Sequence, residues 1–421
     1  MKTRIAIASA ILASAAASAA PQLQHFGTTI NAGASVYPGN VLFVDCTYTK
    51  SPDAHAKVFL VNQAGQVVRT WQTESIRNIA KPVGTDGTIV ALRNGGSGAT
   101  ACSQPKGAVT LSTVSTANVA TSVYYDANCL LSHDIEVMKD GTYLVMCQSL
   151  ITNTAITPQP FLDDVIRRVD ASGHVLWSWS TADHYSQIGL KKLAQTNIMN
   201  GQTYYLTEVP SPAHADVFDT DSIQVIPPNA SAASNTAFTA GNILVSQRNT
   251  NLLFVIDYNT GNVVWSANDI SVGQNNARVI PSGLPGDGHI LMLDDGGRAG
   301  YPPINRNSSK VTEYDPISAT VVWQWGSVSP SRGGFETYER GSAQRLPNGN
   351  TFIDESEWGR FVEVDPTGKI VWEHLHLFGN PSQNKGAPDR TIYRAYKVEL
   401  CWPGCAAQAG VPSGSATSFT W

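Results

Sequence analysis

The feature that most constrains the fold is a short phrase that the chain repeats five times. Its clearest copy runs from Val364 to Trp372 and reads as an alternating strand, the turn Asp-Pro-Thr-Gly, and a strand rich in β-branched residues. A turn that starts with Asp or Asn and carries a Gly able to adopt positive φ joins two strands into a hairpin. The sequence therefore predicts a series of β-hairpins, and the other copies are marked by Trp71, Trp177, Trp265 and Trp323.

Most of these hairpins follow a second phrase of strand, Gly-containing turn and strand, which begins at His133, Asp221, Asn276 and Gly341. The two phrases together give four antiparallel strands, and such a unit repeated about every fifty residues is typical of a β-propeller blade. We therefore predict one all-β domain over residues 20–400, built of four-stranded antiparallel blades. The interval from Ile135 to Ile223 exceeds one blade, which predicts an insertion at residues 181–217. A strand within residues 21–45 is expected to close the ring by pairing with the last blade.

The outer hairpins carry aromatic and histidine side chains whose roles are predicted to be structural. The tryptophans occupy one position of the repeat, which favours packing between blades over a ligand-binding stripe. His174, His374 and His376 lie on outer hairpins, where we expect them to face solvent.

Residues 1–19 have the features of a secretory signal peptide. Lys2 and Arg4 precede an apolar run, and residues 17–19 form an A-x-A cleavage site. The mature protein is therefore expected to be secreted or periplasmic, with no membrane partner. The net charge of −5 becomes more negative once Lys2 and Arg4 are removed, so the surface has no general attraction for nucleic acid. We expect the partner to be a small-molecule substrate.

Six cysteines in an exported chain indicate disulfides. Cys401 and Cys405 are expected to pair because the Pro-Gly between them turns the chain back, at the start of a polar C-terminal tail over residues 401–421. Cys147 either pairs with Cys129 across one blade or stays a buried thiol. This assignment leaves Cys46 and Cys102.

Ordered segments between about residues 40 and 398 carry a family resemblance. They read KVFLVNQAGQVVRTW, HDIEVMKDGTYLV, NILVSQRNTNLLFVIDYNTGNVVW, SAQRLPNGNTFI with GRFVEVDPTGKIVWE, and YRAYKV. Together they resemble the bacterial arylsulfotransferase family. The resemblance implies an exported six-bladed β-propeller that transfers a sulfuryl group between phenols without the nucleotide donor PAPS. The expected function is that of an arylsulfotransferase-like enzyme acting on a phenolic or aryl-sulfate small molecule at the central channel.

The resemblance also implies site residues. In the family a histidine takes the sulfuryl group covalently, helped by further histidines and an arginine. His133 matches the family's His-Asp-Ile motif, and Arg248 matches the arginine that follows the next blade's first hairpin. Histidines of the family are replaced here by Asp219 and Asn275, and the second of these is the position of the covalent histidine. The resemblance therefore implies that the usual nucleophile is missing.

Other candidate site residues are identified by their expected places in the blades. The first strands of the blades converge on the central channel, so residues that open these strands are expected to line it. This places Asp219 and Asp221 with His133 and Arg248 as catalytic candidates. The candidates for substrate binding are Asn275 and Asn276 at a strand start, and Arg298, Tyr338 and Glu339 in loops over the channel mouth. The structural alternative for each is a side chain that holds two blades together, caps a turn or packs a loop.

No cofactor is expected, but a divalent-cation site is an alternative. His133, Asp134, Asp219 and Asp221 offer imidazole and hard oxygen ligands of the kind that suit Ca²⁺ or Mn²⁺. Their spacing matches no diagnostic metal motif.

Three classes of function fit these observations. A sulfotransferase requires net positive potential in the channel. A different enzyme on the same scaffold, a lyase, hydrolase or isomerase, requires a carboxylate within reach of His133. A non-catalytic binding protein tolerates a channel filled by side chains.

Overall fold

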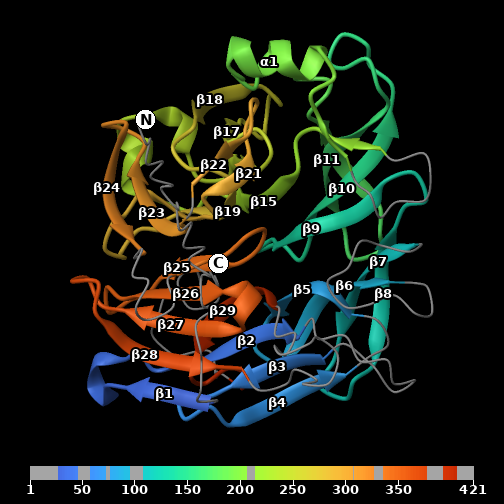
Figure 1. Cartoon of the computed structure of the whole chain (residues 1–421). Helices are drawn as coiled ribbons and strands as arrows, with labels where there is room; N and C mark the ends of the chain where they lie inside the picture. The colour runs from blue at the N-terminus through green and yellow to red at the C-terminus, as the bar shows by residue number, and fades with distance from the viewer. Residues whose placement is uncertain are drawn as a thin grey trace, which may run out of the picture.

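Six antiparallel sheets surround a central axis in the computed structural model, as Figure 1 shows. The structure describes residues 27–45, 57–72, 76–94, 108–205, 214–306, 308–326, 335–376 and 392–404. The inner strands contact one another in the order β29, β5, β9, β15, β19, β25 and back to β29, which closes a ring. The predicted all-β, six-bladed propeller is therefore confirmed.

The second to fifth blades are each built from strands that follow one another along the chain. The second blade contains β5 (Ile76–Val83), β6 (Thr88–Asn94), β7 (Val109–Val114) and β8 (Ala120–Tyr125). The third contains β9 (Leu130–Val137), β10 (Tyr143–Ile151), β11 (Phe161–Val169) and β12 (Val175–Ser180). The fourth contains β15 (Thr220–Val225), β16 (Ile243–Gln247), β17 (Leu252–Ile256) and β18 (Val263–Asn268). The fifth contains β19 (Gln274–Val279), β20 (Ile290–Asp294), β23 (Lys310–Asp315) and β24 (Thr320–Trp325).

The first and sixth blades join the two ends of the described chain. The sixth blade contains β25 (Ser342–Arg345), β26 (Thr351–Glu355), β27 (Arg360–Val364) and β28 (Ile370–Leu375), and β1 (Gly27–Asn31) pairs with β28 at its outer edge. This is the closure that the sequence predicts. The first blade contains β2 (Gly39–Asp45), β3 (Lys57–Val61) and β4 (Val67–Gln72), and its inner strand is the last strand of the chain, β29 (Ile392–Glu399). Strands from both ends of the described chain therefore help to close the ring.

Short elements lie between the blade strands. The predicted insertion at residues 181–217 contains α1 (Lys192–Met199), and β13 (Tyr204–Tyr205) and β14 (Ala215–Asp216) extend the third sheet from β11. A small hairpin, β21 (Gly297–Ala299) and β22 (Ile304–Asn305), interrupts the fifth blade. No helix among the described residues is long and apolar enough to cross a membrane.

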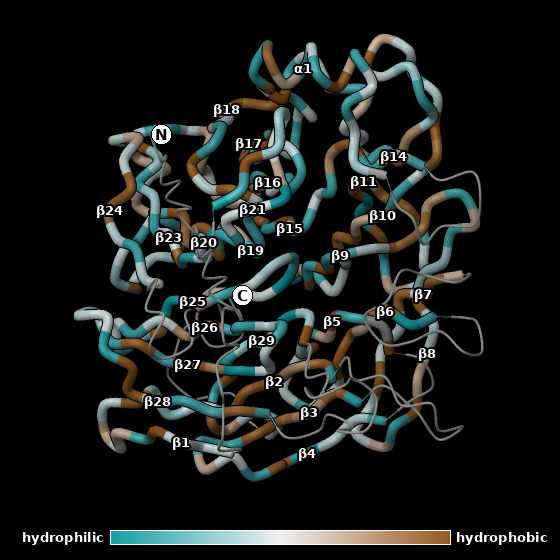
Figure 2. The backbone as a smooth tube through the Cα atoms, in the orientation of Figure 1, coloured by the Kyte–Doolittle hydropathy of each residue, from teal (hydrophilic) through white to brown (hydrophobic). Residues whose placement is uncertain are grey.

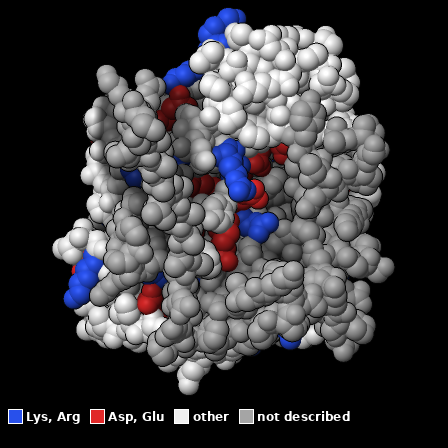
Figure 3. Space-filling model, viewed as in Figure 1, with Lys and Arg blue, Asp and Glu red and all other residues white. Residues whose placement is uncertain are grey.

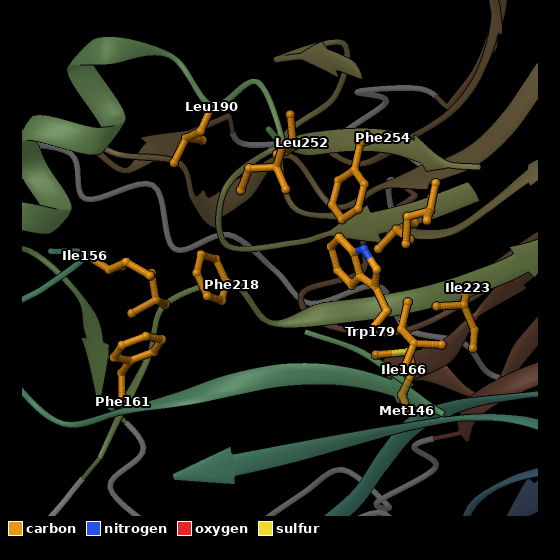
Figure 4. Packing of buried hydrophobic residues seen from close by; sticks show 14 of the residues in the cluster. Met146, Ile156, Phe161, Ile166, Trp179, Leu190, Phe218, Ile223, Leu252 and Phe254 are labelled. Carbon is orange, nitrogen blue, oxygen red and sulfur yellow. The ribbon is translucent and has the colours of Figure 1, made fainter. Parts of the chain in front are cut away.

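The core consists of six apolar clusters, one between each pair of neighbouring blades. In β2, Leu42 and Val44 pack against the second blade while Phe43 packs against the sixth. This follows from the strand period of two, which sends successive side chains to opposite faces. Figure 2 shows the resulting apolar stretches along the blade strands. The largest cluster lies between the third and fourth blades, and Figure 4 shows Phe161, Trp179, Phe218 and Phe254 within it.

Tryptophans of the outer strands connect the first, third, fifth and sixth blades each to the next blade of the ring. The indole N–H groups of Trp71, Trp179, Trp325 and Trp372 donate to backbone carbonyls in the neighbouring blade at 2.9–3.0 Å. Of the tryptophans expected to pack between blades, Trp177 contacts Tyr258 and Trp323 lies under Arg345, both across a blade boundary. Trp265 packs on Phe238 in an insertion of its own blade, and both side chains belong to the apolar contact between the fourth and fifth blades.

The prediction that His374 and His376 face solvent is wrong. Both side chains are buried: His374 stacks on Phe361, and His376 packs edge-on against Phe43. His374 is covered by β1, whose Thr28 lies opposite it in the sheet. His376 is covered by the first blade, where it packs on Phe43 and Phe59. His174, on the uncovered third blade, is 76% exposed as expected.

The disulfide prediction is confirmed for one pair. Cys129 and Cys147 are bonded within the third blade, with their Cα atoms 5.2 Å apart. Cys401 is also disulfide-bonded, but Cys405, Cys46 and Cys102 lie outside the described residues, so its expected pairing with Cys405 stays a prediction. The first residues of the tail are docked between the first two blades, where Trp402 stacks on Trp71. The predicted signal peptide at residues 1–19 also lies outside the described residues.

Candidate functional site

Inner strands of five blades carry a β-bulge near the channel, in β5, β9, β15, β19 and β29. A bulge adds a residue to one strand and re-aims the side chains around it. His133 and Asn276 adopt positive φ, 53° and 51°, at two of these bulges, and Asp219 does so at 49° just before β15. Tyr393 and Arg394 are the bulged residues of β29. The bulges therefore determine which polar groups reach the axis.

A buried ion cluster fills the axis at the level of the bulges. The carboxylate of Asp134 lies 3.1 Å from Lys81, 3.0 Å from Arg278 and 3.2 Å from Arg394. These partners come from the second, fifth and first blades, and such separated blades meet only at the axis. Glu136 adds contacts to Lys81 and Arg278, and Asp221 pairs with Arg394 at 2.9 Å. Burial disfavours ionised Asp134, but the three cations outweigh it and lower its pKa to about 2.

Above this cluster lies a partly exposed group formed by His133, Asp219 and Arg248. His133 Nε2 is 3.6 Å from Asp219 Oδ1, and their side chains remain 16% and 19% exposed. Arg248 Nη1 is 3.7 Å from Asp219 Oδ2. The backbone N–H of Asp219 donates to Asp216, which fixes the turn before β15. Three of the four predicted catalytic residues thus come together at one end of the channel.

Asp295 links Arg248 to Asn275. Its Oδ2 accepts hydrogen bonds from Arg248 Nε at 3.3 Å and from Asn275 Nδ2 at 2.8 Å, and its Oδ1 accepts from the Thr337 hydroxyl at 2.7 Å. The side chain is 1% exposed. Asn275, at the position that the resemblance gives to the covalent histidine, is therefore held as a donor to a buried carboxylate.

The loop residues predicted to bind substrate lie at the outer rim of the same group. Arg298 Nη1 is 3.8 Å from Glu339 Oε1, with both side chains more than half exposed. The Arg298 guanidinium lies over the ring of Tyr338, and the Tyr338 carbonyl accepts from Arg248 Nη2 at 2.8 Å. In Figure 3 acidic and basic side chains lie together over the centre of the ring. The exposed fraction of the side chains therefore decreases from Arg298 and Glu339 at the rim to the buried Asp295.

Carboxylates outnumber cations around His133. Burial, reinforced by Asp219, raises the pKa of Asp164 to about 7. Burial also raises the pKa of Asp216 well above its usual value, and Asp219 and Asp164 raise it further. The pKa of Asp219 is raised by burial and by Glu339, against the opposing effect of Arg248. Gln148 Nε2 donates to both Asp164 and Asp216 and so holds the two acids side by side. The arrangement suits proton transfer more than the binding of an anion.

Asp221 and Asn276 lie one level deeper than the other candidates. Asp221 accepts from Arg394 and from the backbone N–H of Asn276, and its Oδ1 is 3.3 Å from the Tyr393 hydroxyl. The side chain of Asn276 accepts from Arg278. Both residues belong to the hydrogen-bond network of the buried ion cluster.

The ligands considered for a divalent cation are not arranged to hold one. The carboxylate of Asp134 is occupied by Lys81, Arg278, Arg394 and two backbone N–H groups. Within the described ranges, no three His, Cys, Asp or Glu side chains form a group that could bind a metal ion.

Two residues of the site are absent from the sequence-based candidates. Asp295 directly follows β20, the second strand of the fifth blade, just as Arg248 directly follows β16, the second strand of the fourth. Aligning the second strands of the blades would therefore have identified Asp295 as a candidate. Tyr393 lies beside His133, with ring centroids 6.4 Å apart. It belongs to β29, the inner strand of the first blade, and no repeat in the sequence predicts that the last strand of the chain lies there.

Several solved structures match this chain at low sequence identity. One is a protein of unknown function from Bacteroides caccae, with 13% identity, a TM-score of 0.47, and coverage of 86% of this chain and 99% of that one. Another is a putative 6-phosphogluconolactonase from Bacteroides fragilis, with 9% identity, a TM-score of 0.41, and coverage of 86% and 98%. AztD from Citrobacter koseri has 11% identity, a TM-score of 0.40, and coverage of 86% and 99%. At this similarity the matches say nothing about the activity of the present chain. No curated protein matches the sequence.

A family model gives a direct assignment. Residues 107–377, well over half of the chain, match the model described as Arylsulfotransferase (ASST). The matched range contains β7 and β8 of the second blade and the third to sixth blades. It includes His133, Asp219, Arg248, Asn275 and Asp295. The chain belongs to the arylsulfotransferase (ASST) family.

Proposed function

We propose that this protein is an enzyme that performs acid–base chemistry on a phenol-derived small molecule at the mouth of the propeller channel. In this proposal His133 accepts and returns the proton, and Asp219 is its carboxylate partner. The observation that carries the proposal is the distance of 3.6 Å between His133 Nε2 and Asp219 Oδ1 in a partly exposed position. A carboxylate beside an imidazole stabilises the imidazolium that forms when the histidine takes a proton.

The simplest reaction of this kind is hydrolysis of an aryl ester. His133 removes a proton from water, and the water oxygen attacks the acyl carbon as the bond to the aryl oxygen breaks. The proton then passes from His133 to the departing phenolate. Asp219 keeps the imidazole oriented throughout, and its own position is fixed by the hydrogen bond from its backbone to Asp216.

The proposal is tested by measuring the release of coloured 4-nitrophenol from two substrates that share this leaving group. The wild-type protein is incubated with 4-nitrophenyl acetate and with 4-nitrophenyl sulfate, each with and without a phenol acceptor. We expect release of nitrophenol from the acetate without an acceptor, and we expect His133→Ala to lower its kcat/KM by about 10²-fold or more, since a positioned general base contributes this much. His174→Ala, at an exposed histidine of the third blade, is the control and should leave the rate unchanged.

Two outcomes would contradict the proposal. One is acetate hydrolysis of equal rate in wild type and His133→Ala. The other is turnover of the sulfate that depends on the acceptor, which would favour sulfuryl transfer.

Sulfuryl transfer is the second candidate because the chain belongs to the arylsulfotransferase family. In that reaction His133 attacks sulfur, a nitrogen–sulfur bond forms, and the donor phenolate leaves. The acceptor phenol then attacks the same sulfur and frees the imidazole. Arg248 is the nearby cation that could contact the sulfuryl oxygens, but it is paired with the carboxylates of Asp219 and Asp295.

Export to the periplasm or the exterior is also part of the proposal. It is supported by the disulfide between Cys129 and Cys147, since such bonds persist in oxidising compartments. It is supported too by the signal-peptide features of residues 1–19. Mass measurement of the exported protein tests it, because cleavage after Ala19 would leave a chain that begins at Ala20.

A further inference from the structure

Arg248 is the cation that a sulfate ester would need, and each of its three nitrogens already donates a hydrogen bond within the protein. Nε donates to Asp295 at 3.3 Å, Nη1 to the Asn249 side chain at 3.4 Å, and Nη2 to the Tyr338 carbonyl at 2.8 Å. The side chain is 7% exposed. A guanidinium binds a sulfuryl group through a fork of N–H groups aimed at its oxygens. Here the fork is turned into the protein.

The charge of Arg248 is also compensated. Asp295 contacts Nε and Asp219 lies 3.7 Å from Nη1, so two carboxylates face one guanidinium. Burial outweighs the opposing effect of Arg248 and raises the pKa of Asp295 above its usual value, but the hydrogen-bond geometry favours the ionised form. Its oxygens accept from Arg248, Asn275 and Thr337, which are donors suited to an ionised carboxylate. At the rim the exposed Glu339 is paired with Arg298 and leaves this balance unchanged. An anion entering this group would meet more negative than positive charge.

We propose that Asp295 is a specificity-determining residue that directs the site away from anionic sulfate esters and toward uncharged phenols. It acts through Arg248 and Asn275, which it holds in place from beneath the site. This inference rests on the proposed function, because it concerns the same site and the same phenolic substrate class. It adds that the buried residue Asp295, which is not part of the His133 and Asp219 pair, makes the site bind uncharged phenols in preference to sulfate esters.

Binding of two probes that differ by one sulfuryl group tests the inference. We would titrate 4-methylphenol and 4-methylphenyl sulfate into the wild-type protein, Asp295→Asn and Asp219→Asn, and measure Kd by calorimetry or ligand-observed NMR. The wild type should bind the uncharged phenol more tightly than the sulfate. Each substitution should tighten sulfate binding by about tenfold or more, since it removes one negative charge near the guanidinium. Binding of the phenol should change by less.

Asp287→Asn is the matched control. Asp287 is in the turn between β19 and β20, at the end of the fifth blade opposite the site, and it accepts from the backbone N–H of Ala230. The substitution removes the same charge from the same blade and should leave both affinities unchanged. Asp219 is partly exposed, so its variant keeps the test informative should Asp295→Asn fold poorly.

The inference is overturned if the wild type binds the sulfate as tightly as the phenol, or if neither Asp295→Asn nor Asp219→Asn changes the ratio of the two affinities. Absence of binding of both probes to all proteins would also overturn it. Failure of the proposed function has a different signature, namely ester hydrolysis that does not depend on His133 while the affinity ratio still shifts in Asp295→Asn.

Discussion

Asp134 is the residue on which the charge balance of the axis depends. It is fully buried, and it is the shared partner of Lys81, Arg278 and Arg394. Its second oxygen also accepts the backbone N–H of Ile223, which joins the third blade to the fourth. A buried charge is tolerated only when it is paired and hydrogen-bonded. One carboxylate therefore stabilises contacts among five of the six blades.

Asp134→Asn should destabilise the protein strongly. The amide keeps the shape of the side chain but leaves three buried cations with two carboxylates, Glu136 and Asp221. Breaking a buried ion pair in this way costs about 3 kcal/mol or more of the free energy of unfolding, which a urea titration would measure. Asp140→Asn removes a partly exposed partner of Arg168 and should cost less than about 1 kcal/mol. Equal losses in the two variants would show that the ion cluster does not hold the axis together.

At the scale of the element, the sequence predicts which strands line the channel but not the bulges within these inner strands. The turns with Asp and Gly predict the hairpins, and the rule that first strands line the channel brings His133, Asp219 and Asn275 together. The bulges are not visible in the sequence. A shift of one residue moves a side chain to the other face of a strand, so Asp221 and Asn276 were expected beside His133 and lie within the ion cluster. Asp295 and Tyr393 were missed because they lie outside the first strands that the sequence identifies.

The covered strand β28 makes stability depend on pH through His374. Burial, with a smaller effect of His376, lowers the pKa of His374 to about 4 from 6.5. Between these values the unfolded chain binds the proton and the folded protein does not, so stability is complete above pH 6.5 and falls as the pH is lowered toward 4. The loss should reach about 3 kcal/mol.

Urea titrations from pH 7.5 to 4.5 measure this dependence. His374→Gln should flatten it, since the titrating group is removed, whereas His174→Gln should not, because His174 is exposed. A slope that survives His374→Gln would assign the pH dependence to other buried groups.

At the scale of the whole molecule, two strands from opposite ends of the described chain close the ring. β1 adds to the outer edge of the sixth blade, while β29 is the inner strand of the first blade and contacts β2, β5 and β25. The sequence predicts the first closure. The second is not predicted because β29 lacks the hairpin phrase and pairs with a strand about 350 residues earlier in the chain.

Removal of the two closing strands should have unequal effects. A chain that ends at residue 391 lacks β29, exposes the apolar faces of the first blade, and should not give a folded protein. A chain that starts at residue 34 lacks only the outermost strand, and we expect it to fold with a lower Tm. Circular dichroism and thermal melting compare the two, and a folded protein from the first deletion would show that the ring does not depend on β29.

The position of β29 also has a consequence for the time at which the protein acquires its shape. The second to fifth blades come from contiguous segments and can form one after another as the ribosome extends the chain, since domains and local units fold during synthesis. The first blade emerges early but has no inner strand until the ribosome has added Glu399. One of its apolar faces can pack on the second blade, but the face toward the sixth blade stays open until late in translation. The nascent protein is thus an unclosed arc, and only the finished polypeptide becomes a ring.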